Sequence, residues 1–338
     1  ITNPNALVSN WDTSASLGGP IMRDRMWFFG TFRDFGTHQI IPGGFWNKNT
    51  GDPSKWTYDP DESIPSRGAN SRTITNLRLT TQLGQRHKVG VFFDNQLECS
   101  GSAMTTDADN CRPRGNDWVG NGTATSAPEA ASGGSGGVGA AGYADTFSRV
   151  VQGTYTAPVT NQLLLEAGYS SYFSRWGWME PPGAILDLNQ VQDTGIGLTY
   201  RALDWHFNRV NWNQNWRAAA SYVTGAHAMK FGYQHGHDID SGTSFYNHTR
   251  VNYRFNNGVP NRLTMRYGNW YNDQHTMHYG LYGQDSWTMN RLTLQGAVRY
   301  ERAWSWFPAG QGWDGPDRFH AEPQVFDRVT GVPGFNYI

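Results

Sequence analysis

The stretch that decides the fold, residues 76–94, reads NLRLTTQLGQRHKVGVFFD. Two runs of alternating apolar and polar residues flank a polar turn at residues 84–86. The apolar positions on the two sides of this turn are Leu77, Leu79, Leu83, Val89, Val91 and Phe93. An alternation with a period of two and one apolar face predicts half-buried β-strands. Two such runs around a tight turn predict an antiparallel hairpin.

The same hairpin pattern recurs along the chain. Its tight turns fall near residues 20, 85, 160, 226 and 290, which predicts ten strands. The connections between these hairpins are long, at residues 36–69, 99–144, 177–208, 241–273 and 305–338. Within the fourth connection, residues 245–255 and 262–271 predict an extra hairpin around residues 256–258. Short turns at one end of the strands and long loops at the other are typical of an outer-membrane β-barrel.

Composition narrows the class of protein. Among 338 residues only 16% are charged, against about 25% in ordinary soluble domains, and 38% are hydrophobic. Aromatic residues make up 14%, a content that excludes disorder for most of the chain. Lys and Arg (27) balance Asp and Glu (28), so there is no basic footprint for nucleic acid. No apolar run approaches the roughly 18 residues that a membrane-spanning helix needs.

The apolar strand faces carry Tyr and Trp near the strand ends, as at Tyr169, Trp212, Tyr222, Trp287 and Tyr300. Outer-membrane barrels place such aromatic girdles at both membrane interfaces. The predicted fold is therefore all-β, an antiparallel transmembrane β-barrel segment with short periplasmic turns and long extracellular loops. The alternative is a soluble protein of several β-sheets, in which bulky aliphatic residues dominate the packed faces.

Three motifs in sequence order resemble one family. Residues 18–30, GGPIMRDRMWFFG, resemble a hairpin of TonB-dependent receptors of the Oar-like type. Residues 279–287, YGLYGQDSW, followed by RLTL at 291–294 and RYE at 299–301, resemble a second hairpin of that family. Residues 253–261, YRFNNGVPN, look like one of its loop motifs. The resemblance implies a 22-stranded barrel that is filled by a plug.

The same resemblance implies location and partners. It implies the bacterial outer membrane, its lipid, an extracellular nutrient, and the TonB complex, which is reached through a plug domain outside this chain. Ile1 is not a start methionine, and residues 335–338 form no closing strand. Ten strands are fewer than half of such a barrel, so we expect residues 1–338 to form a partial barrel without the plug.

These expectations predict a transport function. The chain is expected to be part of a TonB-dependent receptor that captures and imports a bulky nutrient, such as an oligosaccharide, a peptide or a metal chelate. The alternatives are a surface or adhesive barrel without transport, and a soluble carbohydrate-binding β protein. An enzyme is not expected. His237 and Asp238 are adjacent on a strand and point to opposite faces, and no nucleophile motif accompanies them.

Tryptophans in the long connections, or where these connections begin, are the candidate ligand-binding residues. Large, stiff aromatic rings stack on sugars and on peptide side chains. The alternative is that these rings belong to the outer aromatic girdle or pack the loops against each other. The candidates are Trp46, Trp56, Trp176, Trp178, Trp304, Trp306 and Trp313.

Metal and disulfide candidates are few. His235 and His237 share a strand face with Met229 and Phe231, so we expect them to point outward, and we predict no metal site. Asp107 and Asp109 offer oxygen ligands for Ca²⁺ in the 99–117 loop, but the regular spacing of a calcium loop is missing. No resident cofactor is expected. Cys99 and Cys111 are expected to form a disulfide, and the alternative is two unrelated thiols.

Overall fold

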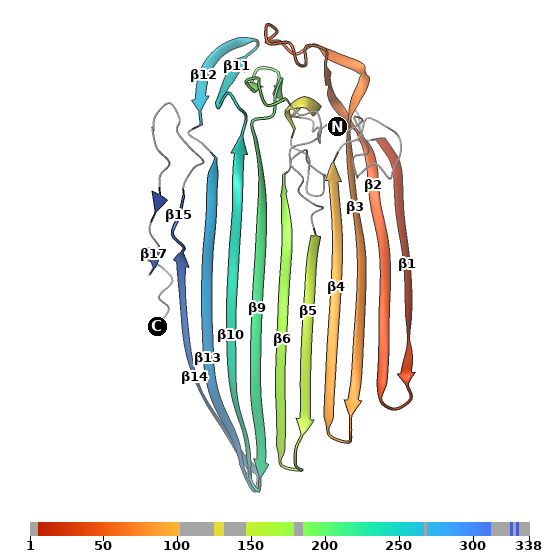
Figure 1. Ribbon diagram of the computed structural model, residues 1–338, viewed down its shortest axis with the longest axis vertical. Helices are drawn as coiled ribbons and strands as arrows, with labels where there is room; N and C mark the ends of the chain where they lie inside the picture. The colour runs from red at the N-terminus through yellow and green to blue at the C-terminus, as the bar shows by residue number, and fades with distance from the viewer. Residues whose placement is uncertain are drawn as a thin grey trace.

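A computed structural model describes residues 6–101, 125–131, 147–178, 185–266, 269–311, 325–326 and 329–330. One tall antiparallel sheet dominates it (Figure 1). The ten long strands are β1 (Ala6–Met22), β2 (Met26–Asn47), β3 (Pro60–Leu83), β4 (His87–Gly101), β5 (Phe147–Pro158), β6 (Leu163–Trp178), β9 (Trp205–Thr224), β10 (His227–Tyr246), β13 (Trp270–Met289) and β14 (Leu292–Phe307). The predicted all-β, antiparallel fold with about ten long strands is confirmed.

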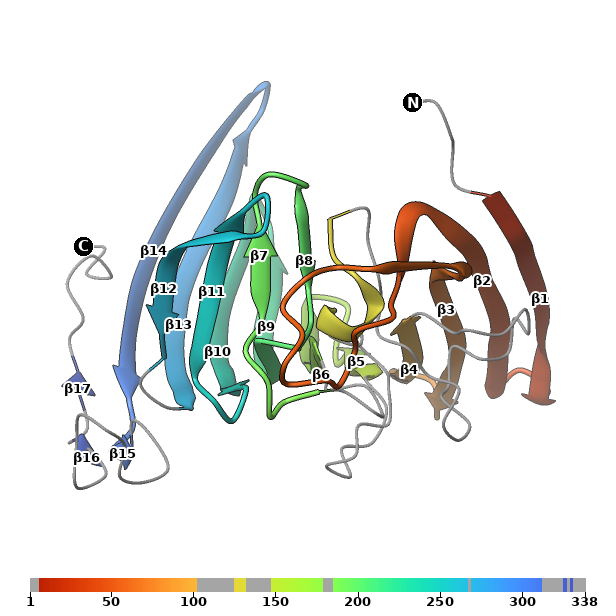
Figure 2. The same ribbon diagram turned by 90° about the horizontal axis from the view of Figure 1, so that it is seen from above.

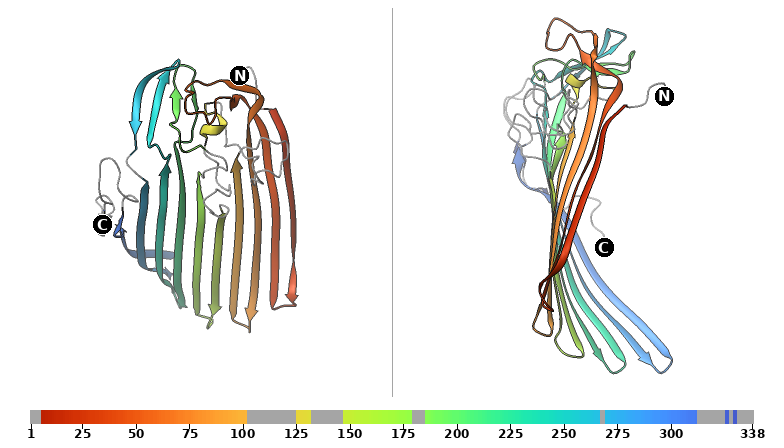
Figure 3. Two further views of the ribbon diagram at one scale, coloured as in Figure 1. Left: turned by 45° about the horizontal axis from the view of Figure 1, so that its top comes forward. Right: turned by 90° about the vertical axis from the view of Figure 1, so that its right-hand side faces the viewer.

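The long strands pair in the order in which they occur in the sequence. A two-residue strand, β17 (Val329–Thr330), adds to β14 as an eleventh member. Seen from above, the sheet follows an open arc from β1 to β14 (Figure 2). Seen edge-on, the sheet is bent and twisted (Figure 3), as the right-handed twist of β-strands requires.

Short elements lie at one end of the sheet. A four-stranded sheet has the order β12 (Val259–Met265), β11 (Val251–Asn256), β7 (Val191–Asp193) and β8 (Leu198–Tyr200). A 3₁₀-helix, η3 (Pro128–Ala130), lies beside them, above the middle of the large sheet (Figure 1). A further two-residue pair joins β15 (Gly310–Gln311) to β16 (Val325–Phe326). Among the described residues no helix is long and apolar enough to cross a membrane.

The opposite end of the sheet carries only short turns. They lie at residues 23–25, 84–86, 159–162, 225–226 and 290–291. Left-handed backbone conformations close several of them, with φ of 60° at Asp24, 64° at Gly84 and 51° at Asn290. Glycine and Asn or Asp tolerate this conformation best, which explains the residue types found there.

The strands extend further into the long connections than the side-chain alternation predicts. The first predicted loop, residues 36–69, is reduced to residues 48–59, because β2 continues to Asn47 and β3 starts at Pro60. A register shift between Ile40 and Phe45 interrupts this pairing without ending it. Hydrogen bonds between backbone N–H and C=O groups pair the strands whatever the side chains are. The strands therefore continue beyond the residues whose side chains alternate between apolar and polar.

The extra hairpin lies within the fourth connection, with shorter strands than predicted. β11 and β12 meet at Asn257 and Gly258, whose φ values are 48° and 79°. Two consecutive positive φ values are the signature of a type I′ turn, and Asn-Gly is the sequence that favours it.

The two faces of the large sheet differ in chemistry. On one face Leu77 lies opposite Phe93 of β4 and Gly30 of β2. On the other face Asn76 lies opposite Asp94 and Thr31. The first is called the apolar face, and its side chains are unusually exposed: Val298 is 78% exposed and Leu17 is 70% exposed. The second is called the polar face.

Aromatic side chains form two bands on the apolar face. One band lies near the short turns and includes Tyr155, Tyr222 and Trp287. The other lies nearer the long connections, where Phe173 contacts Trp212 edge-on with ring centres 6.1 Å apart. Between the bands the apolar face carries aliphatic residues together with Phe231, Tyr233 and Tyr300. Aromatic residues near both strand ends match the aromatic girdles of outer-membrane barrels.

Candidate functional site

A small buried cluster ties the long connections together. It is called the cap, and it comprises residues 48–59, 125–131, 185–204 and 247–266. Its buried apolar side chains are Ala127, Val191, Leu198, Tyr200 and Phe255, and Trp56, Tyr58 and Tyr253 pack against them. The Trp56 ring stacks on Phe255 at 6.2 Å and meets Tyr253 edge-on at 5.3 Å. The cap is thus a conventional apolar core built above the sheet.

Arg201 is the polar centre of the cap. Its side chain is buried, and its guanidinium donates hydrogen bonds of 2.9 Å to each of three backbone carbonyl oxygens, those of Pro53, Lys55 and Asn189. The guanidinium carbon also lies 3.8 Å from the centre of the Trp56 ring. Burial lowers the pKa of Arg201 from its ordinary value. Arg201 therefore ties two connections together through their backbones.

Two further titratable groups of the cap are buried next to Arg201. Tyr200 donates its hydroxyl hydrogen to the carbonyl oxygen of Trp56 at 3.0 Å, and burial raises the pKa of Tyr200 to about 12. The Arg201 backbone N–H donates to Oε1 of Glu129 at 3.0 Å. Burial raises the pKa of the Glu129 carboxyl above its ordinary value of 4.5. Desolvation disfavours the charged form in both cases.

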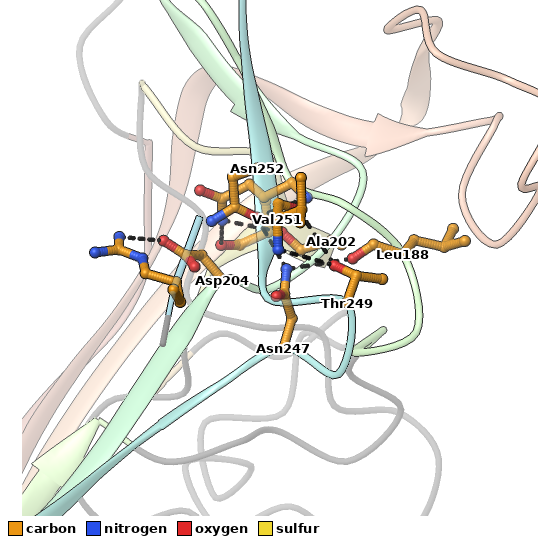
Figure 4. A network of polar contacts seen from close by, with 10 residues as sticks. Leu188, Ala202, Asp204, Asn247, Thr249, Val251 and Asn252 are labelled. Atoms are coloured by element: carbon orange, nitrogen blue, oxygen red, sulfur yellow. Dashed lines mark hydrogen bonds and ion pairs between the residues drawn. The ribbon is translucent and has the colours of Figure 1, made fainter. Parts of the chain in front are cut away.

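A network of amide side chains joins the cap segments to each other (Figure 4). Asn247 donates to Oδ1 of Asn252 at 2.9 Å and to the carbonyl oxygen of Leu188 at 3.3 Å. At the edge of this network Arg266 forms an ion pair of 2.8 Å with Asp204. These bonds fix the segment that enters β9 against the end of β12, and this segment forms one wall of a pocket.

The pocket lies below the cap at the upper end of the polar face and has a volume of about 670 Å³. It is called the upper pocket. Its aromatic rings are close together: Trp205 stacks on Phe207 at 4.9 Å, and Trp176 meets Phe207 edge-on at 5.4 Å. Its lining comprises Trp176, Asp204, Trp205, Phe207, Arg209, Ser244, Tyr246 and Arg266.

Two guanidinium groups face these rings. Arg266 lies 5.1 Å from the centre of the Tyr246 ring, and Arg209 lies 6.0 Å from the centre of the Trp176 ring. Arg209 is 3.3 Å from the Asp240 carboxylate, so each cation of the pocket also has an acidic partner. Flat apolar surfaces with hydrogen-bonding groups at their edges suit a planar polar ligand, such as a sugar ring, a peptide group or an aromatic chelator.

The candidate tryptophans lie in three different environments. Trp176 lines the upper pocket, and its Nε1–H donates to Oδ1 of Asn211. Trp56 is packed inside the cap, and Trp46 is half-buried opposite Asp61 near the end of β2. Trp304 and Trp306 lie on the apolar face, where Trp304 meets Tyr279 edge-on at 6.0 Å.

The remaining tryptophan candidates are not defined as side chains. Trp178 ends β6, and Trp313 lies outside the described residues. For Trp56 the geometry favours the loop-packing alternative, and for Trp304 and Trp306 it favours the girdle alternative.

The two candidate histidines lie on the apolar face with separate partners. The His235 ring is 5.3 Å from that of Trp216, whereas Nε2 of His237 is 3.2 Å from Nδ1 of His275. In the part of the chain that the structure describes, no group of three or more His, Cys, Asp or Glu side chains is placed to hold a metal ion. Asp107, Asp109 and Cys111 lie outside the described residues, and Cys99 is defined in β4 by its backbone alone. The calcium and disulfide expectations therefore stay predictions.

Sequence reasoning missed most of the upper pocket. Trp205, Phe207 and Arg209 alternate with other residues, so they share the polar face of β9, and a strand face that carries two aromatic rings and a cation is a signal for ligand contact. Arg266 and Asp204 gave no such signal, because they meet only when the cap folds.

Comparisons with known proteins address the fold. No model of a protein family matches the sequence, and no curated protein matches it. Among solved structures, the outer membrane transporter YddB from Escherichia coli matches 88% of this chain and 36% of its own length, with 9% identity and a TM-score of 0.50. The chain thus spans about a third of this transporter, and the likeness supports the fold of an outer-membrane β-barrel wall.

Two further solved structures align over most of this chain with lower scores. The ferripyoverdine receptor of the outer membrane of Pseudomonas aeruginosa matches 96% of this chain and 38% of its own length, with 12% identity and a TM-score of 0.47. The ferric yersiniabactin uptake receptor FyuA from Yersinia pestis matches 95% and 49%, with 11% identity and a TM-score of 0.46.

Proposed function

We propose that this chain forms part of the wall of a TonB-dependent receptor in the bacterial outer membrane, which captures and imports a bulky nutrient. The observation that carries the proposal is the two-faced sheet, whose polar face holds an aromatic pocket with two guanidinium groups at the end with the long connections. The apolar, aromatic-banded face is the side that outer-membrane lipid would cover. The polar face is the side that water and nutrient would occupy.

Two observations support the transport role over the alternatives. A soluble β protein covers its apolar strand faces with a second sheet, whereas Val298, Leu281 and Phe231 are more than half exposed here. The fold is that of the wall of a protein named as an outer membrane transporter. We also propose that TonB supplies the energy for import through a plug domain outside this chain. This part of the proposal is supported by the resemblance of the motif at residues 18–30 to TonB-dependent receptors. The chain contributes binding and wall surface, and we assign it no enzymatic step.

The nutrient class follows from the upper pocket. Stacked rings beside Arg209 and Arg266 favour a ligand with flat faces and polar edges. Oligosaccharides, peptides and metal chelates with aromatic groups all meet that requirement. Trp176 is the residue on which the proposal depends most, because it is both a predicted ligand residue and part of the pocket lining.

An uptake experiment tests the proposal. The full-length protein is produced in the outer membrane of cells with and without TonB, and radiolabelled oligosaccharides, peptides and ferric chelates are supplied. We expect saturable uptake of at least one probe in cells with TonB only. We expect Trp176→Ala to reduce uptake at low probe concentration about tenfold, the effect of losing a central aromatic contact. The matched control is Trp304→Ala on the apolar face, which should leave uptake unchanged.

Other outcomes identify the alternatives. Binding of the cells to a surface without uptake of any probe would favour an adhesive barrel. A full-length protein that purifies as a single species without detergent would favour a soluble carbohydrate-binding protein and would overturn the membrane assignment.

A further inference from the structure

A second pocket on the polar face lies near the short turns and is strongly basic. It is called the lower pocket, and its volume is about 350 Å³. Its lining includes three cations from three strands, Arg78 of β3, Lys88 of β4 and Arg217 of β9. Three threonine hydroxyls face the same space, and no carboxylate is among the lining residues. These threonines are Thr80, Thr154 and Thr156.

Glycines make room for this arrangement. A Cβ at Gly168 of β6 would lie 2.8 Å from Nε of Arg217, so the Arg217 side chain lies across β6 and would have to shift if residue 168 carried a side chain. A Cβ at Gly90 would likewise lie 2.7 Å from Oγ1 of Thr154. Glycine weakens the interior of a strand and often marks a close approach of another group. Gly90 therefore shapes the lower pocket directly, whereas Gly168 does not line it and makes room for the Arg217 side chain.

The three cations differ from other cations of the polar face in having no acidic partner. Lys230 pairs with Glu166 at 2.8 Å, and Arg33 pairs with Asp12 at 2.6 Å. Within the described residues, none of Arg78, Lys88 and Arg217 takes part in an ion pair. Three like charges around one space repel each other, and an anion bound between them would relieve that repulsion.

We propose that the lower pocket binds an oxyanion, the carboxylate or phosphate group of a ligand that reaches it along the polar face. Guanidinium groups bind both anions through paired hydrogen bonds, and the hydroxyls of Thr80 and Thr156 supply further donors. A neighbouring pocket of about 360 Å³ shares Gln152, Thr154 and Arg217 with it, so the anion site is continuous with a polar path towards the middle of the sheet. The inference rests on the proposed function in one respect: it makes the imported nutrient an acidic one.

Anion binding to the full-length protein in detergent tests the inference. Inorganic phosphate and citrate are titrated separately by isothermal calorimetry at low and high concentrations of sodium chloride. We expect saturable binding of at least one of them, weakened by salt, and the tighter of the two indicates whether phosphate or carboxylate is preferred. Arg217→Gln and Arg78→Gln should each weaken the binding about tenfold, as expected for losing one charged hydrogen-bonding partner.

Control variants keep the outcome interpretable. Arg33→Gln removes an equivalent charge that already has an acidic partner on the same face, and it should leave anion binding unchanged. Arg217→Lys retains the charge and should retain part of the affinity, which separates loss of the site from loss of folding. Absence of binding to both anions, or equal binding by the wild type and Arg217→Gln, would overturn the inference. TonB-dependent uptake would still stand in that case, whereas uptake that does not require TonB would overturn the proposed function and leave the anion site intact.

Discussion

The large sheet and the cap use apolar residues in opposite ways. The cap buries Val191, Leu198, Tyr200 and Phe255 in a conventional core, whereas the sheet leaves Val298 and Leu17 exposed. The cap is therefore built to be stable in water, and the sheet is built for a boundary between an apolar and an aqueous phase. The comparison teaches that a low overall hydrophobic content is compatible with a membrane wall, because only every second strand residue must be apolar.

A charge placed on the apolar face is the strongest test of this difference. Val298→Arg would put a guanidinium in the middle of the proposed lipid surface, and we expect it to lower the free energy of unfolding by about 2–4 kcal/mol. The neighbouring substitution Ala297→Arg points to the polar face and should change stability by no more than about 0.5 kcal/mol. Urea unfolding of the full-length protein in lipid vesicles measures both. Equal effects of the two substitutions would show that the faces do not meet different solvents.

The sequence predicted this wall well, because alternation is a local signal. Residues 77–93 contain the alternation that predicts both strand faces and also the turn between the two strands. The Asn257-Gly258 turn can likewise be predicted from adjacent residues alone. The cap could not be predicted in the same way. Trp56, Tyr200 and Phe255 come from three separate connections, and nothing in their local sequence indicates that they meet.

The same limit explains the mixed outcome for the candidate site. Trp176 was a candidate because it lies where the third long connection begins, and it does line a pocket. Trp56 had the same local appearance and is packed inside the cap beneath Arg201. Local sequence marks an aromatic residue as unusual, but the fold of distant segments decides whether its ring faces a ligand or a core.

Removal of the polar centre of the cap tests whether the cap is an independent unit. Arg201→Ala loses three hydrogen bonds to backbone carbonyls and the contact of the guanidinium with the Trp56 ring. We expect the local stability of the cap to fall by about 3 kcal/mol, while the stability of the sheet stays unchanged. Hydrogen exchange measured by mass spectrometry should show faster exchange in the cap segments only, above all in residues 48–59 and 185–204, which Arg201 joins. Faster exchange across the whole sheet would mean that cap and sheet unfold together.

The buried carboxyl of Glu129 gives the stability of the cap a pH dependence. Its folded pKa is raised, so its contribution to stability is present below pH 4.5 and is lost as the pH rises through the raised value. We expect proteolysis of the cap to become faster over that pH window, after correction for the protease's own pH profile. Glu129→Gln keeps an acceptor for the Arg201 N–H and should remove the dependence. An unchanged profile in Glu129→Gln would assign the effect to another group.

The smallest expected effect comes from the polar face of the sheet itself. Arg33 and Asp12 form an ion pair of 2.6 Å, yet both side chains are about half exposed. An ion pair that is exposed to water contributes little to the free energy of unfolding. We therefore expect Arg33→Gln to lower this free energy by less than about 1 kcal/mol. The difference should shrink further in concentrated salt, because salt screens charges that water reaches. A cost of several kcal/mol would show that the polar face is dry, and it would remove the distinction between the two faces on which the proposed nutrient path depends.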